Sequence, residues 1–328
     1  MKVLVKGAGV AGLTAAHELV RRGAQVVVAD PRRDAAAAAS WYAGGMLAPW
    51  CERESAEQPV LDLGIGAADW WEGALPGHVL RRGTLVVAPA RDRSELARFA
   101  SRTGGFVAVD AGGIAELEPD LAGRFREGLH FAAEAHLDPR AALEALHGEL
   151  SANGVIFDTG TPVENRFDRV IDCTGMARAA ADARLRGVRG EMLILRSREV
   201  TLSRPVRLLH PRIPLYVVPR SGNRFMVGAT MIESGSAQPI TARSMMELLN
   251  AAYSLHPAFG EAEILETGVG VRPAYADNLP RVEQSGRSIT VNGLYRHGFL
   301  LAPAMARQAA ELAFERSEAR ELAHETDG

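Results

Sequence analysis

The chain has 328 residues, of which 47% are hydrophobic, and a formal net charge of −3 at pH 7. A chain of this length can bury a large core in two domains, or in one α/β unit that carries an insertion. This charge gives no support for binding to nucleic acid or to an anionic membrane, and no run is long and apolar enough to span a bilayer. Because the first expected strand starts directly after Met1, we expect no signal peptide and a cytoplasmic protein.

Cysteine and lysine usage narrows the possible chemistry. The two cysteines, Cys51 and Cys173, do not make a disulfide framework. The only lysines, Lys2 and Lys6, both belong to the first expected strand, so we expect no lysine Schiff base of the pyridoxal type. The sequence also contains no Walker-type phosphate loop, and we predict no metal site.

The first thirty residues follow the order strand, glycine-rich turn, helix, strand and acidic residue. Strands at 3–5 and 26–29 flank a helix that runs to Val20, and Asp30 follows the second strand. The turn has the sequence Gly7-Ala8-Gly9-Val10-Ala11-Gly12. This is the fingerprint of a dinucleotide-binding site in its required structural context.

Each glycine of the turn has a physical role in that interpretation. Gly7 permits the tight turn, Gly9 lets the backbone approach a pyrophosphate, and Gly12 lets the helix pack close to the strand. The free N–H groups and the positive dipole end of the helix then face the phosphates. Asp30 is placed to accept hydrogen bonds from an adenosine ribose, and an acid there favours NAD or FAD over NADP.

The rest of the chain alternates between α/β and antiparallel β patterns. We expect helices at 58–74, 94–103, 139–152 and 241–254, and a last helix from Ala304 after a loop at 298–303. Strands are expected at 84–89, 105–109, 128–132, 154–158, 169–172 and 288–291, and long alternating strands at 188–232. Within the last region, 215–219 and 224–228 should form a hairpin around Ser221-Gly222-Asn223.

These elements predict an α/β fold with an α+β insertion. A discontinuous Rossmann-like nucleotide domain should carry an inserted antiparallel-sheet substrate domain. We assign residues 1–76, 134–188 and 268–328 to the nucleotide domain, and residues 77–133 and 189–267 to the substrate domain.

Further motifs carry a family resemblance through most of the chain. They are Gly44-Gly45-Met46-Leu47-Ala48-Pro49, Tyr216-Val217-Val218-Pro219-Arg220, Val227-Gly228-Ala229-Thr230-Met231, Gly270-Val271-Arg272-Pro273 with Asp277, and 292–298 running on to Ala302-Pro303. In these residues the chain resembles the glycine oxidases of thiamine biosynthesis, within the wider D-amino-acid oxidase and sarcosine oxidase group of flavoenzymes. The resemblance implies bound FAD, oxidation of glycine or a similar small amino acid to the imine, and hydrogen peroxide from reoxidation by oxygen. No cysteine lies near 296–303, so we expect the FAD to be non-covalent.

The resemblance implies that four residues surround the substrate. Arg272 pairs with the substrate carboxylate, since a guanidinium offers two N–H groups to two oxygens. Tyr216 reaches the same carboxylate, Met231 lines the pocket wall, and Arg296 lies near the substrate and the flavin.

The resemblance also implies FAD contacts beyond the fingerprint. Val163 contacts adenine through its backbone, and Thr174 and Gly175 close over the pyrophosphate. One further set lies along the diphosphate and the flavin ring: Ser40, Gly44, Gly45 and Met46. Another lies at the flavin N1–C2=O edge: His297, Gly298, Phe299, Leu300 and Leu301. Arg272 and Arg296 complete the FAD-contacting set.

For each of these residues a purely structural role stays open. Arg272 could cap a sheet edge or pair with Asp277, and Tyr216 and Met231 could be ordinary packing residues. Arg296 could bind a phosphate or a backbone carbonyl, and 298–303 could be a plain loop before a helix. An isolated histidine is more often structural than catalytic, so no catalytic base is assigned among His136, His210 and His297.

Three alternatives to glycine oxidation also stay open. The first is a D-amino-acid or sarcosine oxidase, or a dehydrogenase that uses an electron acceptor other than oxygen. The second is a nicotinamide enzyme that uses only the N-terminal unit, and the third is a catalytically silent FAD-binding module that assembles with a partner. The resemblance alone implies a thiazole-forming enzyme as a partner, and a homo-oligomer stays possible.

Overall fold

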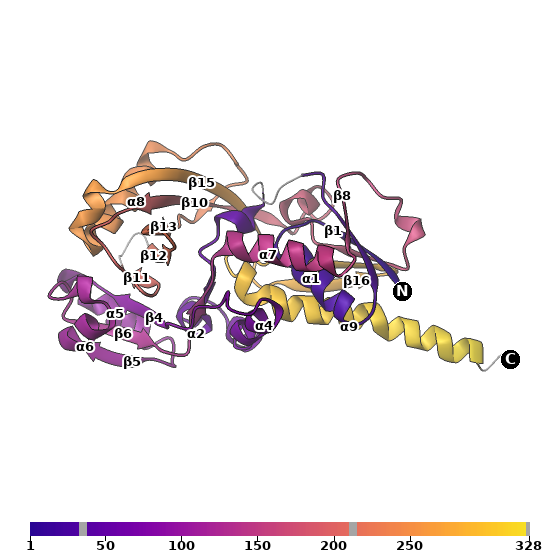
Figure 1. Ribbon diagram of the computed structural model, residues 1–328, viewed down its shortest axis with the longest axis horizontal. Helices are drawn as coiled ribbons and strands as arrows, with labels where there is room; N and C mark the ends of the chain where they lie inside the picture. Colours follow the sequence, from indigo (N-terminus) through magenta and orange to yellow (C-terminus); the bar gives the residue numbers. More distant parts are fainter. Residues whose placement is uncertain (33–37, 210–214, 326–328) are drawn as a thin grey trace.

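The computed structural model describes residues 1–32, 38–209 and 215–325, and it contains two sheet-based units (Figure 1). The first unit is built on a six-stranded sheet with the order β16-β17-β9-β1-β2-β8. Its strands are parallel except β16. Their bounds are Lys2–Lys6 (β1), Gln25–Ala29 (β2), Ile156–Asp158 (β8), Arg169–Asp172 (β9), Arg281–Ser285 (β16) and Ser288–Asn292 (β17).

Three helices cover one face of this sheet: α1 (Val10–Arg21), α7 (Pro139–Ala152) and α9 (Gly298–Glu325). Val3 and Val5 of β1 pack into the cluster on the helix side, whereas Leu4 points into a smaller cluster on the other face. Strands buried on both faces are typical of a parallel sheet, which explains the continuous apolar runs at 3–5 and 26–29. Asp138 caps α7 by accepting hydrogen bonds from the N–H groups of Arg140 and Ala141, as the Asp-Pro pair predicts.

The second unit is built on a nine-stranded sheet with the order β14-β10-β13-β12-β11-β4-β6-β5, in which β15 pairs with β10. All its strand pairs are antiparallel except β4 with β11. The strands are Thr84–Val87 (β4), Val107–Asp110 (β5), Glu127–Phe131 (β6), Arg186–Arg196 (β10), Val206–Leu208 (β11), Leu215–Arg220 (β12), Arg224–Gly228 (β13), Ile232–Glu233 (β14) and Glu263–Ala274 (β15). The hairpin of β12 and β13 is confirmed, with Gly222 and Asn223 at positive φ in its turn.

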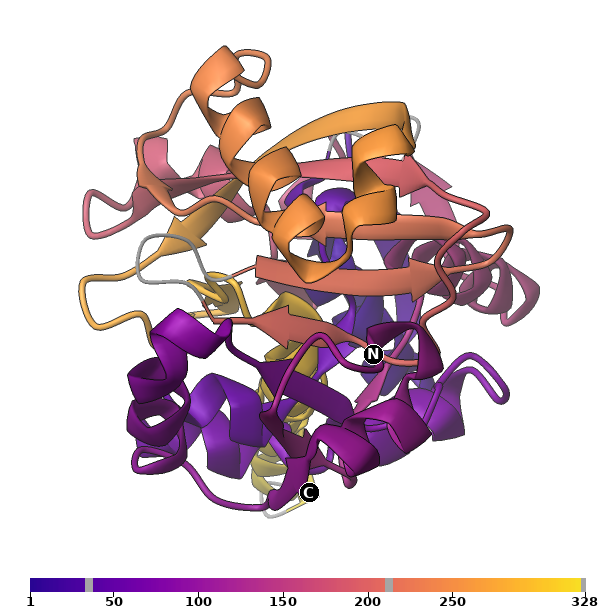
Figure 2. The same cartoon turned by 90° about the vertical axis from the view of Figure 1, so that its left-hand side faces the viewer.

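Helix α8 (Ala242–Leu255) lies across one face of this larger sheet, in front of the strands in Figure 2. The smaller helices of the unit are α5 (Arg93–Ala100) and α6 (Ala111–Leu117). Between the two sheets lie α2 (Pro49–Arg53) and a two-stranded ribbon of β3 (Met46–Leu47) with β7 (Ala135–His136). This ribbon brings the Gly-Gly-Met-Leu motif to the junction of the units.

This architecture confirms the predicted fold class, an α/β nucleotide unit with a mostly antiparallel insertion. Strands from 77–133 and from 189–267 join in one sheet, although they lie far apart in the sequence. The domain boundaries stay a prediction. Strand β10 crosses the expected boundary at 188/189, and β15 crosses the one at 267/268. The two units therefore share continuous strands.

The helix expected at 58–74 is wrong as a single element. The structure has two helices there, α3 (Gln58–Gly64) and α4 (Ala67–Ala74). Gly64 and Gly66 flank the break, and glycine weakens a helix interior. A Cβ at Gly64 would lie 2.8 Å from Cγ of Leu300, so the glycine also lets α9 approach closely.

The loop expected at 298–303 is also wrong, because α9 begins at Gly298 and contains Pro303. A proline inside a helix leaves the carbonyl four residues earlier without its N–H partner, here that of Phe299. The indole Nε1–H of Trp71 donates to this carbonyl at 2.8 Å. This tertiary hydrogen bond lets the helix continue through the proline, and sequence patterns do not reveal it.

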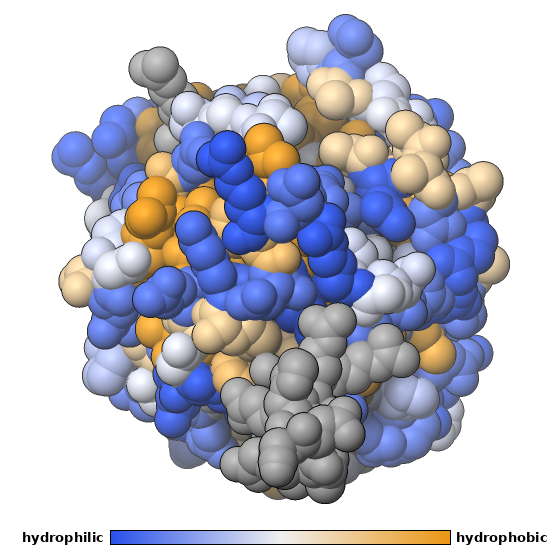
Figure 3. Space-filling view, turned by 90° about the vertical axis from the view of Figure 1, so that its right-hand side faces the viewer, coloured by the Kyte–Doolittle hydropathy of each residue, from blue (hydrophilic) through white to orange (hydrophobic). Residues whose placement is uncertain are grey.

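The outer surface at the nucleotide-unit end is mostly hydrophilic, with scattered apolar side chains (Figure 3). Within 1–32, 38–209 and 215–325, no helix has the length and apolarity needed to cross a membrane. Both cysteines are buried and free.

Candidate active site

The glycine-rich turn has the steric constraints that the fingerprint predicts. Gly7 has a φ of +98°, and a Cβ there would lie 2.6 Å from the carbonyl oxygen of Cys173. A Cβ at Gly12 would lie 1.8 Å from the carbonyl oxygen of Gly7. At Gly9, the N-cap of α1, the nearest atom outside the adjacent residues to an added Cβ is Ser40 Oγ at 3.5 Å, an ordinary contact distance. The turn is therefore closed toward β9 and α1 but leaves space beside Gly9.

Asp30 directly follows β2 and is buried beside this turn. Its carboxylate accepts hydrogen bonds from the N–H of Ala8 at 2.8 Å and from the Arg32 guanidinium at 2.6 and 2.8 Å. Burial alone would raise the pKa of this carboxyl, but the bonds to Arg32 and Ala8 outweigh burial and lower it. Asp30 is thus an ionised acceptor at the end of β2, where the predicted ribose contact requires one.

The other residues predicted near the nucleotide gather around the same strand ends. Ser40 Oγ accepts from the N–H of Val10 at 3.3 Å, and Thr174 lies next to Gly7. Val163 is exposed, and its neighbour Glu164 pairs with Lys6 at the end of β1 at 3.0 Å. Because nucleotides bind at the carboxyl ends of parallel strands, this arrangement fits an FAD pyrophosphate and adenosine; the individual contacts stay predictions.

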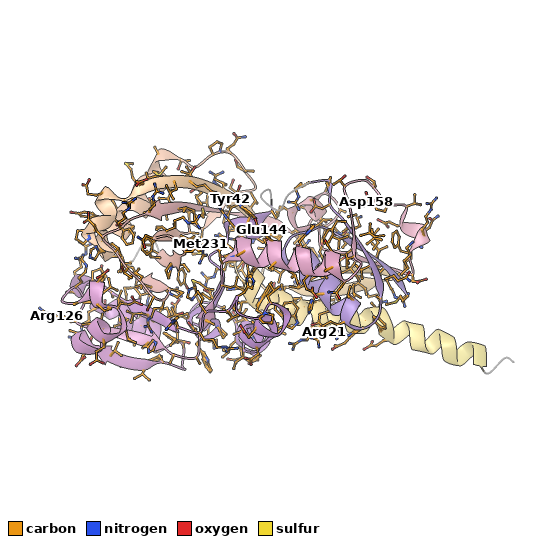
Figure 4. The ribbon with its side chains drawn as sticks, in the orientation of Figure 1. Arg21, Tyr42, Arg126, Glu144, Asp158 and Met231 are labelled. Atoms are coloured by element: carbon orange, nitrogen blue, oxygen red, sulfur yellow. The ribbon has the colours of Figure 1, made fainter. Side chains whose placement is uncertain are left out.

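A pocket lies at the junction of the two units, with about 750 Å³ of space free of atoms, its open mouth included. Figure 4 shows Met231 and Tyr42 near the centre of the molecule, whereas Arg126 and Asp158 lie toward opposite ends. The pocket is lined by Ala43, Gly44, Gly45, Met46, Glu52, Tyr216, Met226, Gly228, Ala229, Met231, Arg272, Arg296, His297, Gly298, Phe299 and Leu300.

The pocket thus brings together all four residues predicted around the substrate and most of those predicted at the flavin ring. Leu301 is fully buried in the core and does not line it. Ser40, Val163, Thr174 and Gly175 also lie outside its lining, in keeping with their expected position near the adenosine and pyrophosphate. Of the histidines, His136 is buried within the ribbon, on β7, and His210 lies outside the described residues.

Arg272 lies on β15, opposite Val188 of β10. Its guanidinium packs against Gly190, where a Cβ would lie 2.1 Å from Nη2, and donates to the carbonyl of Thr230 at 3.1 Å. No carboxylate of the described chain pairs with it, and Asp277 pairs with Arg281 instead. Burial lowers the pKa of the Arg272 guanidinium to about 10, so it stays charged at neutral pH. The pocket therefore holds a cation that forms no ion pair with a carboxylate of the described residues.

Sequence reasoning missed Glu52, the carboxylate of this pocket. Glu52 lies in α2, is 8% exposed, and accepts a hydrogen bond from the Tyr216 hydroxyl at 3.0 Å. Its Oε2 lies 2.8 Å from Nη2 of Arg296 and 3.3 Å from Nδ1 of His297. Burial alone would raise the pKa of Glu52, but the charges of Arg296, His297 and Arg207 outweigh burial and lower it to about 2. The sequence feature that could have pointed to Glu52 is its position, three residues after the end of the Gly44–Pro49 motif.

Arg296 and Met231 lie together at the pocket wall. Arg296 donates to Ser55 Oγ at 2.6 Å, and its Nη1 lies 3.5 Å from the sulfur of Met231. Met231 is 45% exposed, which is incompatible with the alternative of ordinary core packing. Both side chains are thus available to a ligand in the pocket.

His297 and the start of α9 close the inner end of the pocket. His297 is buried, and burial lowers its pKa to about 4, so its ring is neutral at pH 7. Gly298 is the first residue of α9, and the free N–H groups of a helix start favour negative charge. Gly45, on the facing side, has a φ of +69°, and a Cβ there would lie 2.2 Å from the carbonyl of Leu137.

The comparisons with known proteins agree with this geometry. The family described as "DAO: FAD dependent oxidoreductase" matches residues 2–312. The "Putative thiamine biosynthesis oxidoreductase ThiO" of Rhizobium etli is 64% identical, over 94% of this chain and 95% of its own. A "Bifunctional protein ThiO/ThiG" of a Nostoc species is 29% identical over 98% of this chain, which spans 54% of that protein. The crystal structure of glycine oxidase from Geobacillus kaustophilus superposes with a TM-score of 0.81 at 22% identity, covering 95% of this chain and 94% of that one.

Proposed function

The chain belongs to this family of FAD-dependent oxidoreductases, and from that membership we propose that it oxidises glycine, or a similarly small amino acid, to the imine for thiamine biosynthesis. The observation that carries the proposal is the unbalanced guanidinium of Arg272 in a pocket that also contains the start of α9. The 64% identical relative supports the pathway, and the solved glycine oxidase supports the substrate.

FAD fits the residues that the structure provides. Gly9 leaves space beside the turn for a pyrophosphate, and the ionised Asp30 lies at the end of β2, where the fingerprint places the ribose contact. Bound FAD supplies the two-electron acceptor of the reaction. Neither Cys51 nor Cys173 lines the pocket, which supports the prediction that the cofactor is non-covalent.

The substrate carboxylate pairs with Arg272 in this proposal. Two parallel N–H groups hold two oxygens, and each hydrogen bond to a charged group contributes about 1.5–3 kcal/mol. This pairing also orients the Cα of the amino acid, which is the protein's main contribution when a cofactor performs the chemistry. Met226, Met231 and Tyr216 leave room for a small side chain beside it.

No side chain in the pocket is suited to accept a proton near neutral pH. The pKa of Glu52 is about 2 and that of His297 about 4, and both lie well below the operating range of a general base. The substrate amine therefore loses its proton to water before oxidation. We therefore assign no catalytic base.

We further propose that a thiazole-forming enzyme consumes the imine. The matched region covers only part of the bifunctional Nostoc relative, so that chain carries a second protein fused to one similar to this chain. Fusion of two enzymes suits a product that water destroys quickly. Molecular oxygen would take the electrons from the reduced flavin and give hydrogen peroxide as the second product. We also propose that the protein acts in the cytoplasm.

The test is a substrate screen that follows bleaching of the bound flavin without oxygen. We expect glycine to bleach the flavin faster than sarcosine, D-alanine or D-proline. Admission of oxygen should then restore the colour and release peroxide; restoration only by an artificial dye would identify a dehydrogenase. Bleaching by none of the four substrates would contradict the proposal and favour a silent FAD-binding module.

A further inference from the structure

Three charged side chains face the pocket in the described chain: Arg272, Arg296 and Glu52. The imidazole of His297, which also lines the pocket, is neutral at pH 7. The pocket thus contains two cations and one anion before any substrate enters. One positive charge remains for a ligand.

Glu52 is not shared equally between the two cations. It forms an ion pair with Arg296 at 2.8 Å, whereas Arg272 binds only the Thr230 carbonyl. The Tyr216 hydroxyl holds the other carboxylate oxygen of Glu52, and Ser55 holds the guanidinium of Arg296. Each partner of the ion pair is therefore also held by a hydrogen bond to another residue.

Arg296 would be a second carboxylate site if Glu52 were uncharged. Its guanidinium lines the same pocket as that of Arg272 and presents two N–H groups, which suits bidentate recognition of a carboxylate. Glu52 already occupies that guanidinium. A ligand with a second carboxylate would have to displace Glu52 from Arg296 or lie beside it, and like charges in a partly buried site repel strongly.

We propose that Glu52 is a specificity-determining residue that pairs with Arg296 and so restricts the pocket to amino acids with a single carboxylate. This inference rests on the proposed function and narrows its substrate class. Glu52 acts by rejection: glycine and its small N-alkyl or Cα-alkyl relatives meet only Arg272, whereas an N-carboxymethyl amino acid also meets Glu52.

Binding of non-oxidisable ligands tests this inference without turnover. Methoxyacetate carries one carboxylate. Diglycolate is the same molecule with a second carboxylate attached to the methoxy carbon. Each is titrated into the FAD-loaded enzyme, and the change in the visible flavin spectrum gives Kd. For the wild type we expect methoxyacetate to bind about tenfold or more tighter than diglycolate.

Two variants isolate the role of the Glu52 charge. Glu52→Gln keeps the shape of the side chain and frees Arg296, so diglycolate should gain about tenfold or more and become the tighter ligand. Glu52→Gln with Arg296→Gln removes both charges, so the two Kd values should approach each other. If the single variant fails to fold, the double variant still tests the proposal, because a wild-type preference that persists in it contradicts rejection by Glu52.

Equal binding of the two ligands by the wild type would overturn the proposal, as would a Glu52→Gln variant that keeps FAD but still rejects diglycolate. Turnover can be compared in the same way for iminodiacetate, which has two carboxylates, and N-ethylglycine, which has one. In Glu52→Gln the turnover of iminodiacetate relative to that of N-ethylglycine should rise. Failure of the proposed function is recognised separately. If no amino acid bleaches the flavin but the diglycolate preference reverses, glycine oxidation is wrong and the role of Glu52 stands.

Discussion

The glycine-rich turn and the substrate pocket are constructed in different ways. The turn consists of backbone from one short segment, and its constraints are steric: Gly7 and Gly12 have no space for a Cβ. The pocket consists of side chains from α2, β12, β15 and the approach to α9, and its properties depend on which charges pair. A local motif therefore specifies the turn, whereas only the tertiary fold specifies which guanidinium is left for a ligand.

The strongest test of the turn is a substitution that only its close packing forbids. Gly12→Ala places a methyl group 1.8 Å from the Gly7 carbonyl, so we expect a loss of about 3 kcal/mol or more and failure to retain FAD. Gly23→Ala is the matched control, because Gly23 also precedes β2 but has no atom within 4 Å of an added Cβ. Its positive φ should cost only about 1 kcal/mol. Denaturant unfolding and bound-flavin content measure both, and equal losses would contradict the steric account.

The pocket, in contrast, should make stability depend on pH. His297 has a folded pKa of about 4 and an ordinary value of 6.5, so the unfolded chain binds the proton more readily between these values. Stability should therefore fall as pH drops through 6.5 toward 4, by up to about 3 kcal/mol from this residue. His297→Asn removes the titration and should flatten the curve in this window. The free energy of unfolding is measured for both proteins at pH 7, 6, 5 and 4. An equal change with pH in the wild type and in His297→Asn would contradict the account.

A third test concerns the hydrogen bond between α4 and the start of α9, which lines the pocket. Trp71→Phe leaves the Phe299 carbonyl without a hydrogen-bond partner, because Pro303, four residues later, has no N–H to donate. An unsatisfied buried acceptor costs about 1–3 kcal/mol. Trp41→Phe is the control, because none of the described hydrogen bonds uses its indole N–H. Thermal unfolding should separate the two variants. A smaller effect at Trp71 than at Trp41 would mean that the hydrogen bond does not support α9.

The smallest expected effect is that of the Tyr216 hydroxyl. Tyr216→Phe removes one hydrogen bond to Glu52 but keeps the ring, over which Arg207 lies at 5.0 Å. We expect the rate of flavin reduction at low glycine concentration to fall about tenfold, with FAD content unchanged. An unchanged rate would leave Tyr216 with a packing role only.

The sequence predicted those parts of the molecule whose cause is local. The fingerprint, the Asp138 cap and the β12–β13 hairpin follow from residues within a few positions of one another. The errors have tertiary causes. Trp71, far away in the chain, lets α9 begin before Pro303, and the close approach of Leu300 accompanies the glycine break between α3 and α4. Glu52 was missed for the same reason, since its partners lie on β12 and next to α9.

The most direct measurement of the central claim compares Arg272→Met with wild type in anaerobic flavin reduction by glycine. Arg281→Met serves as the control, because Arg281 pairs with Asp277 away from the pocket. We predict a loss of about 100-fold or more in the second-order rate constant for Arg272→Met, with FAD content unchanged, and a change within about twofold for Arg281→Met. A rate for Arg272→Met within about threefold of the wild type would show that this guanidinium does not hold the substrate.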